Sequence, residues 1–215
     1  MNDEQSPSLP GRQRQAARND ARILQAAREV FIADADAPIA AVAVRAGVGI
    51  GALYRRYGSK EDLLRQLGRD GLTHYLELVE AALADTQDPG AAFARFMQEA
   101  VIADTHSLTL HLAGRFTPTD DLWRDGDRAA ELTAALLARA QAAGTLRVDV
   151  TVGDLTMIFE QLAAIAVGGS ERTLQLRLRY LALFLIALQP SQATAPLPGP
   201  PPAWQEMSAR FSPGG

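Results

Sequence analysis

The stretch from Ala40 to Leu64, AAVAVRAGVGIGALYRRYGSKEDLL, constrains the fold more than any other part of the chain. Apolar residues recur at helical spacing in its first half, and Gly47 and Gly49 then interrupt the pattern. The second half places Leu53 and Tyr57 four residues apart, on one face of another short helix. Two helices joined by a short turn that contains glycine form a helix-turn-helix, whose second helix can lie in the major groove of DNA.

This stretch resembles the DNA-binding module of the TetR family of bacterial transcriptional repressors. The preceding segment 21–31 (ARILQAAREVF) fits the same family, and residues 140–155 (AQAAGTLRVDVTVGDL) resemble a junction common in its regulatory domains. The resemblance implies an all-α protein, with an N-terminal three-helix helix-turn-helix head and a helical-bundle regulatory domain. The residues that carry it are Val42, Ala43, Ala46, Gly47, Val48, Gly51, Leu53, Tyr54, Tyr57, Ser59, Lys60, Leu63 and Leu64.

Composition shifts along the chain divide it into four segments. We expect residues 1–11 to be a disordered N-terminal arm and residues 12–58 to form the helix-turn-helix DNA-binding domain. Residues 59–189 carry apolar side chains at helical spacing, with no convincing strand, and are expected to form the helical ligand-binding and dimerisation domain. Residues 190–215 are rich in proline, which cannot continue a helix, so we expect a disordered and dispensable tail.

The net charge of −4 hides an asymmetry between the two ends of the chain. Eleven basic and six acidic residues lie between Arg12 and Arg69, whereas 10 basic and 17 acidic residues follow from Asp70 onward. Basic side chains supply most of the sequence-independent affinity for DNA. The asymmetry therefore predicts double-stranded DNA as a partner of the N-terminal part alone.

Several classes of protein and site find no support in the sequence. The chain has no cysteine, which excludes disulfides and thiolate metal sites, and His106 and His111 lack the spacing of a helical metal pair. We expect no metal, no cofactor and no enzymatic activity, because no catalytic constellation can be assembled. The N-terminal residues do not resemble a secretory signal, and no apolar run is long enough for a membrane span, so a cytoplasmic protein is expected.

The expected DNA contacts combine what the resemblance implies with what the residues can do. The resemblance places Tyr54 and Lys60 on phosphates, and Ile50, Gly51 and Ala52 beside base edges although none of the three carries a side-chain donor. The full set of expected DNA contacts is Arg45, Ile50, Gly51, Ala52, Tyr54, Arg55, Arg56, Tyr57 and Lys60. The arginines at 12, 14 and 18 fit both a minor-groove arm and a basic tail without a defined role.

For the C-terminal part, the resemblance implies a small-molecule pocket and a dimer interface. The candidate pocket residues, which are also typical of an ordinary core, are Phe93, Phe96, Met97, Phe116, Trp123, Met157, Phe159 and Gln161. Residues 171–188 are apolar nearly all round, as expected for a helix buried on two sides. The candidate interface residues are Ile165, Leu181, Phe184, Leu185 and Leu188.

Together these patterns predict a ligand-responsive transcriptional repressor. It would act as a homodimer on a roughly palindromic operator and be released by a mostly apolar small-molecule effector. The alternative is a small-molecule sensor or partner-binding module whose helix-turn-helix head no longer binds DNA, since the base-facing positions are apolar.

Overall fold

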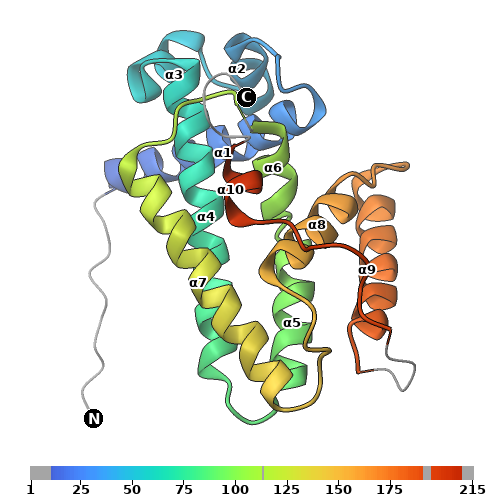
Figure 1. Ribbon diagram of the computed structural model, residues 1–215. Coiled ribbons are helices and arrows are strands. Elements are labelled where there is room, and N and C mark those ends of the chain that lie inside the picture. Colours follow the sequence, from blue (N-terminus) through green and yellow to red (C-terminus); the bar gives the residue numbers. More distant parts are fainter. Residues whose placement is uncertain (1–10, 113, 191–194, 210–215) are drawn as a thin grey trace, which may run out of the picture. The chain divides into compact units, whose positions relative to one another are not determined.

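The computed structural model describes residues 11–112, 114–190 and 195–209, which form ten helices and no strand (Figure 1). This confirms the predicted all-α class. Contacts divide the chain into two compact units, Met1–Leu63 and Leu64–Gly215, whose described parts we call the head and the body. Among the described residues, no helix has the length and apolar character that crossing a membrane requires.

The head is built from α1 (Gly11–Ala33), α2 (Ile39–Ala46), α3 (Ile50–Tyr57) and the start of α4 (Lys60–Ala84). The turn between α2 and α3 needs glycine, because Gly47 adopts the left-handed conformation at φ +64° and its N–H closes the end of α2. Phe31, Val42 and Leu53 are fully buried and join α1, α2 and α3 in one small core. The predicted helix-turn-helix is thus present.

The helix starts in the head differ in how they are capped. Pro38 and Gly49 precede α2 and α3, and neither residue has a side-chain acceptor that could cap the helix it precedes. Ser59 precedes α4, and its hydroxyl accepts the N–H of Asp62 at 3.0 Å. The first turn of α4 is therefore the most firmly capped helix start in the described part of the head.

The body contains the rest of α4, α5 (Pro89–Ile102), α6 (Thr105–Leu112), α7 (Asp120–Ala142), α8 (Val152–Ala163), α9 (Ser170–Ala187) and α10 (Trp204–Ser208). Helix α5 lies at its centre and packs against α7, α8 and α9. Phe93, Phe96 and Met97 of α5 are buried there against Leu136 and Phe159. Burial of these large side chains supplies most of the stabilisation of the body.

A buried arginine fixes the position of α9. The Arg177 guanidinium donates from Nη1 to the Asp104 carboxylate at 2.6 Å, and from Nη2 and Nε to the carbonyl oxygens of Ala163 and Ile165 at 2.8 and 3.1 Å. A buried charge is tolerated only when it is paired and hydrogen-bonded in this way. The cluster joins α9 to the end of α8 and to the turn between α5 and α6.

The C-terminal residues 195–209 differ from the predicted disordered tail. The side chain of Met207 in α10 is only 5% exposed, and the N–H of Leu197 donates to Asp149 at 3.0 Å. Proline stops α9 from continuing but does not prevent an extended segment from packing, and such a segment has no periodicity that a sequence reading could detect. Of the predicted arm at 1–11, residues 1–10 lie outside the described residues, as do the remaining tail residues 191–194 and 210–215.

Candidate functional site

The outer face of α3 is open to solvent. Ile50 and Tyr54 are 45% and 46% exposed, and Gly51 and Arg55 are exposed beside them. Spacing by four residues stacks these side chains in two rows on one face of the helix, opposite the buried Leu53. No ion pair to Arg55 occurs among the residues that the structure describes.

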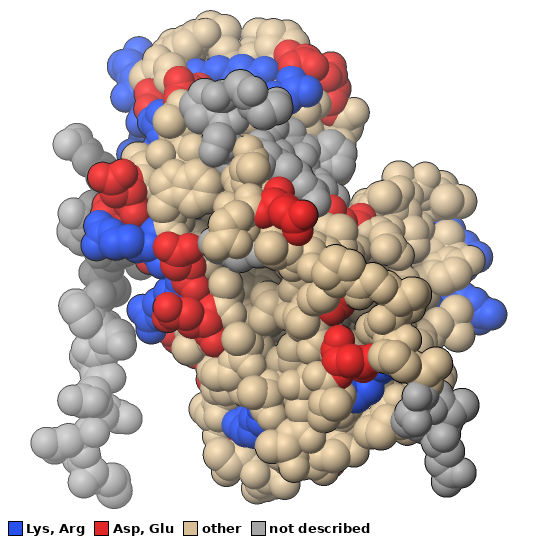
Figure 2. All heavy atoms as spheres, viewed as in Figure 1, with Lys and Arg blue, Asp and Glu red and all other residues tan. Residues whose placement is uncertain are grey.

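The other two arginines of the predicted DNA interface are paired with carboxylates of α1. Arg45 Nε donates to Glu29 at 2.6 Å, and Arg56 Nε donates to both Asp20 oxygens at 2.9 Å. Figure 2 accordingly shows Lys and Arg atoms of the head beside those of Asp and Glu. Exposed pairs of this kind are worth about 0–1 kcal/mol, so a phosphate can compete for either guanidinium.

Three further predicted contacts lie in less open positions. Tyr57 is only 8% exposed and packs in the head core, so the expectation of a DNA contact from its side chain is wrong. The reason is its position four residues after Leu53, on the inner face of α3. Ala52 is half-buried, and the Lys60 ammonium donates to the carbonyl oxygens of Ala37 and Ala35 at 2.8 and 3.3 Å.

Val44, which is not among the predicted DNA contacts, is 83% exposed on α2. It lies off the apolar stripe formed by Val42, Ala43 and Ala46. A large apolar residue on the outer face of an amphipathic helix was the available signal. Val44 lies on the helix that precedes α3 and adds apolar surface to the head.

The body contains a cavity of about 220 Å³ that is partly open to solvent and lined by α4, α6, α7 and α8, with Met207 of α10 in its wall. Small residues create this space. Gly71 of α4 and Gly126 of α7 line the cavity, and a Cβ placed on either would meet nothing within 4 Å. Glycine inside a helix costs about 1 kcal/mol relative to alanine, so glycines that face open space indicate a binding role rather than close packing.

A short hydrogen-bonded chain supplies polar groups to the cavity wall. The Thr133 hydroxyl donates to the carbonyl oxygen of Ala129 at 2.7 Å, so in the 2.9 Å contact with Tyr75 the phenol must be the donor. The Tyr75 oxygen therefore keeps acceptor capacity. Burial raises the pKa of Tyr75 to about 12, so the phenol stays protonated at neutral pH.

The cavity wall carries almost no formal charge. Burial lowers the pKa of His106 to about 4, so its imidazole is neutral at pH 7. The ring stacks on Phe159 with centroids 4.2 Å apart. Glu160 is the one acidic residue among the described residues of the wall, and no lysine or arginine accompanies it there.

Only some of the predicted pocket residues lie in the cavity wall. Phe116 and Trp123 line the cavity. Phe93, Phe96, Met97 and Phe159 are instead buried in the core of the body and are not part of the cavity wall. Met157 and Gln161 are also outside the wall, since Val152, Thr156 and Glu160 form the cavity face of α8 and the next positions are rotated away.

The missed wall residues are mainly small or polar, whereas the sequence analysis sought aromatic and methionine side chains. Glycines within the predicted helices were the signal that could have found the cavity. The wall residues that were missed and that bear most on ligand chemistry are Gly71, Tyr75, His106, Gly126, Thr133, Thr156, Glu160 and Met207.

The candidate interface residues of α9 also separate into two groups. Leu181 and Leu188 are buried in the core of the protomer, so the expectation that they meet a partner is wrong. Phe184, Leu185 and Ile165 are half-buried against the same core. The open apolar face of α9 instead consists of Tyr180, Leu183 and Ile186.

The described residues contain no cluster of three or more His, Asp or Glu side chains that could hold a metal ion. The sites are therefore an open helix face in the head and an apolar cavity in the body.

Comparisons with known proteins agree with this arrangement. The family model "Bacterial regulatory proteins, tetR family" matches residues 23–67, and "Transcriptional regulator SbtR-like, C-terminal domain" matches residues 88–190. No curated protein matches the chain significantly.

Among solved structures, a TetR transcription regulatory protein from Mycobacterium vanbaalenii is 28% identical, with a TM-score of 0.53 over 83% of this chain and 99% of that one. A TetR transcriptional regulator from Streptomyces coelicolor is 27% identical, with a TM-score of 0.55 over 80% and 99%. LfrR from Mycobacterium smegmatis, solved in complex with proflavine, shares the fold at 20% identity and a TM-score of 0.57 over 84% and 99%. The chain belongs to the TetR family of bacterial transcriptional regulators.

Proposed function

We propose that this regulator is a ligand-responsive repressor that binds a roughly palindromic operator as a homodimer. A mostly apolar effector, bound in the cavity of the body, releases it from DNA. The cavity is the observation that carries the proposal, because a concave, mostly apolar space with a few polar groups is where small ligands bind.

The DNA contacts come from the open face of α3 and from the start of α4. Ile50 and Gly51 face thymine methyl groups or allow close approach of the backbone, while Tyr54 and Arg55 bind phosphates. The positive end of the α4 dipole favours another phosphate at the start of this helix, next to Lys60.

The wall chemistry restricts the class of effector. The described wall residues include no lysine or arginine, so an anionic ligand would lose its hydration without gaining a counter-ion from them. The effector is therefore an apolar molecule that is uncharged or positively charged. The Tyr75 phenol oxygen and the His106 ring supply hydrogen-bonding partners that orient it.

Coupling between effector and DNA runs through α4. This helix begins with Lys60 and continues into the cavity wall at Leu67, Gly71 and Tyr75. Effector bound against these residues changes the course of the helix, and with it the separation of the two heads in the dimer. If the effector lowers the affinity for operator DNA by some factor, reciprocity requires operator DNA to lower the affinity for the effector by that factor too.

Fluorescence anisotropy with DNA from upstream of the protein's own gene tests this function. Arg55→Ala should weaken binding and flatten the dependence of log affinity on log salt concentration by about one unit, because one phosphate contact is lost. Arg172→Ala removes another exposed arginine, on α9, and should leave both the DNA affinity and its salt dependence unchanged. Equal behaviour of the two variants would exclude Arg55 from the DNA interface.

The second candidate is a sensor or partner-binding module that no longer binds DNA. The apolar character of Ile50, Gly51 and Ala52 favours it, together with the pairing of Arg45 and Arg56 within the head. This function predicts no binding to upstream DNA at any salt concentration, with ligand binding to the body retained.

A further inference from the structure

The chain returns to the body after α9 as an extended segment, residues 195–209, which we call the strap. It runs past the start of α8 and ends in α10 (Figure 1). Its five prolines lack N–H donors and favour an extended backbone, so the strap forms few hydrogen bonds of its own. Most of its described residues are exposed, but Met207 is buried and lines the cavity.

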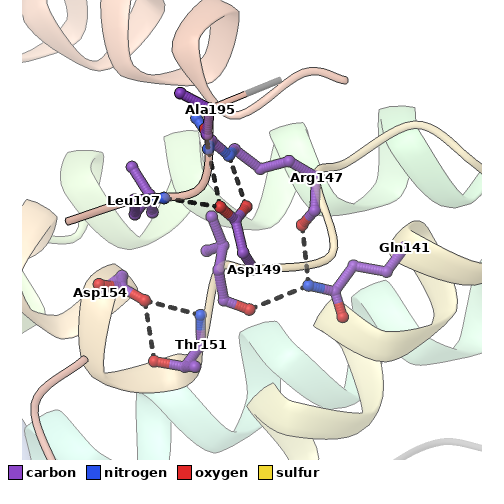
Figure 3. Close-up of polar contacts among 8 residues, drawn as sticks. Gln141, Arg147, Asp149, Thr151, Asp154, Ala195 and Leu197 are labelled. Carbon is purple, nitrogen blue, oxygen red and sulfur yellow. Dashed lines mark hydrogen bonds and ion pairs between the residues drawn. The ribbon is translucent and has the colours of Figure 1, made fainter. Parts of the chain in front are cut away.

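One anchor of the strap is a carboxylate in the loop before α8. Arg147 donates to Asp149 in a bidentate pair, from Nε at 2.6 Å and from Nη2 at 2.8 Å, and the same carboxylate accepts the N–H of Leu197 at 3.0 Å (Figure 3). Arg147 Nη2 also donates to the carbonyl oxygen of Ala195 at 3.3 Å. Both ends of the ion pair therefore bind the backbone of the strap.

The anchor itself is held firmly by the body. The Gln141 side-chain amide donates to the carbonyl oxygens of Arg147 and Val150 at 3.0 and 2.9 Å (Figure 3). The N–H of Arg147 donates to the carbonyl oxygen of Leu188 at 2.9 Å. The strap can consequently leave while the loop that receives it keeps its shape.

The second anchor is a close backbone approach at Gly153, the second residue of α8. A Cβ at this position would overlap the carbonyl oxygen of Pro202. The glycine is not needed for its own backbone conformation, since α8 is an ordinary helix there. Its absent side chain serves the contact with the strap.

We propose that the strap is a detachable lid over the effector cavity and that effector uptake requires its release. This inference rests on the proposed function, because it assigns a gate to the same cavity. Met207 covers part of the cavity, whose wall it shares with residues of α8 and α4, while Pro202 and Leu197 hold the strap at the start of α8. Release breaks the hydrogen bonds of Leu197 and Ala195 to the Asp149–Arg147 pair and exposes Met207, without unfolding any of the helices α4–α9.

The Gly153→Ala variant tests the lid, with Gly169→Ala as its matched control. Alanine at 153 displaces Pro202, whereas a Cβ at 169 meets nothing within 4 Å. Hydrogen exchange at the Leu197 amide, measured without any ligand, should become faster in Gly153→Ala alone. This measurement establishes strap release independently of ligand binding.

Stopped-flow fluorescence with N-phenyl-1-naphthylamine, an uncharged apolar dye, then measures access to the cavity. A lid that is open for about a tenth of the time slows association about tenfold, so Gly153→Ala should speed association by about that factor. Gly169→Ala should match the wild type. Met207→Ala, which leaves both anchors intact, should also speed association and serves if Gly153→Ala fails to fold.

The outcomes separate the lid from the proposed function. Faster exchange at Leu197 with unchanged dye association in Gly153→Ala overturns the lid but leaves the cavity as a ligand site. Failure of the wild type and both strap variants to bind the dye overturns the apolar ligand site, and the lid with it. Dye binding that leaves operator affinity unchanged contradicts the repressor mechanism, but neither the lid nor the ligand site.

Discussion

At the scale of single residues, the surroundings of a side chain determine its chemistry more than its type does. His106 is the clearest example, since its ring lies between Phe159 and Tyr75, with centroid distances of 4.2 and 5.5 Å. Burial without an acidic partner disfavours the imidazolium and lowers its pKa to about 4.

This pKa predicts a pH-dependent stability. An unfolded chain has a histidine pKa near 6.5 and binds a proton between about pH 6.5 and 4 that the folded protein excludes. The contribution of neutral His106 to the free energy of unfolding is therefore complete above pH 6.5. It falls as the pH decreases, by about 3 kcal/mol at pH 4. Urea unfolding of His106→Gln should lose this part of the pH dependence, while His74→Gln, at an exposed position on α4, should keep it. Parallel pH profiles for both variants would contradict the burial of a neutral His106.

Residue roles could be predicted from the sequence only where local periodicity determines them. Leu53 was expected to point inward and does so, because helix spacing alone fixes that face. The partners of Arg45 and Arg56 could not be predicted, since Glu29 and Asp20 are 16 and 36 residues away in the chain. Their pairing depends on how α1 packs against α2 and α3.

At the scale of helices, the end of α4 depends on a side chain from another helix. Arg139 of α7 donates from Nη1 to the carbonyl oxygen of Leu83 at 2.7 Å and from Nη2 to that of Ala82 at 2.6 Å. The last carbonyl groups of a helix have no partner within it, and a cation there also favours the helix dipole. Arg139 thus fixes the C-terminal end of the helix whose middle lines the cavity.

Arg139→Met should lower the free energy of unfolding by about 2 kcal/mol, because two charge-assisted hydrogen bonds at a half-buried site are lost. Hydrogen exchange should also become faster at the end of α4. The control is Arg128→Met, which breaks an exposed pair between the same two helices, with Glu80, and should cost at most about 1 kcal/mol. Equal losses in chemical denaturation would show that Arg139 acts only as a surface charge.

Periodicity predicted the helices but not the orientation of their faces around the cavity. The α8 pattern does not distinguish the face with Thr156 and Glu160 from the face with Met157 and Gln161, because each set follows helical spacing. Only the packing of α8 against α6 and α7 decides which face lines the space. The packing of the strap on the body could not be predicted for a different reason, because an extended proline-rich segment has no hydrophobic periodicity.

At the scale of the whole molecule, the open apolar surface of α9 indicates a partner. Ile186 is 65% exposed, and Leu183 and Tyr180 extend the same surface toward the start of the helix. The opposite face of α9 is already occupied by the core of the body, through Leu181 and Leu188. A helix that is apolar on both sides is stable in water when a second surface covers it, and a second copy of the chain supplies one under the proposed dimer.

Ile186→Glu should convert the dimer to a monomer, because the new carboxylate would be buried in the interface without a counter-ion. Ile102→Glu is the matched control, since Ile102 is 56% exposed and lies at the end of α5 rather than on the open apolar face of α9. Sedimentation velocity should show a monomer for the first variant and a dimer for the second. Operator affinity should fall when the dimer is lost, since two heads must reach two half-sites at once. A fully dimeric Ile186→Glu would remove this face of α9 from the interface, whereas a monomeric wild type would contradict the homodimer itself.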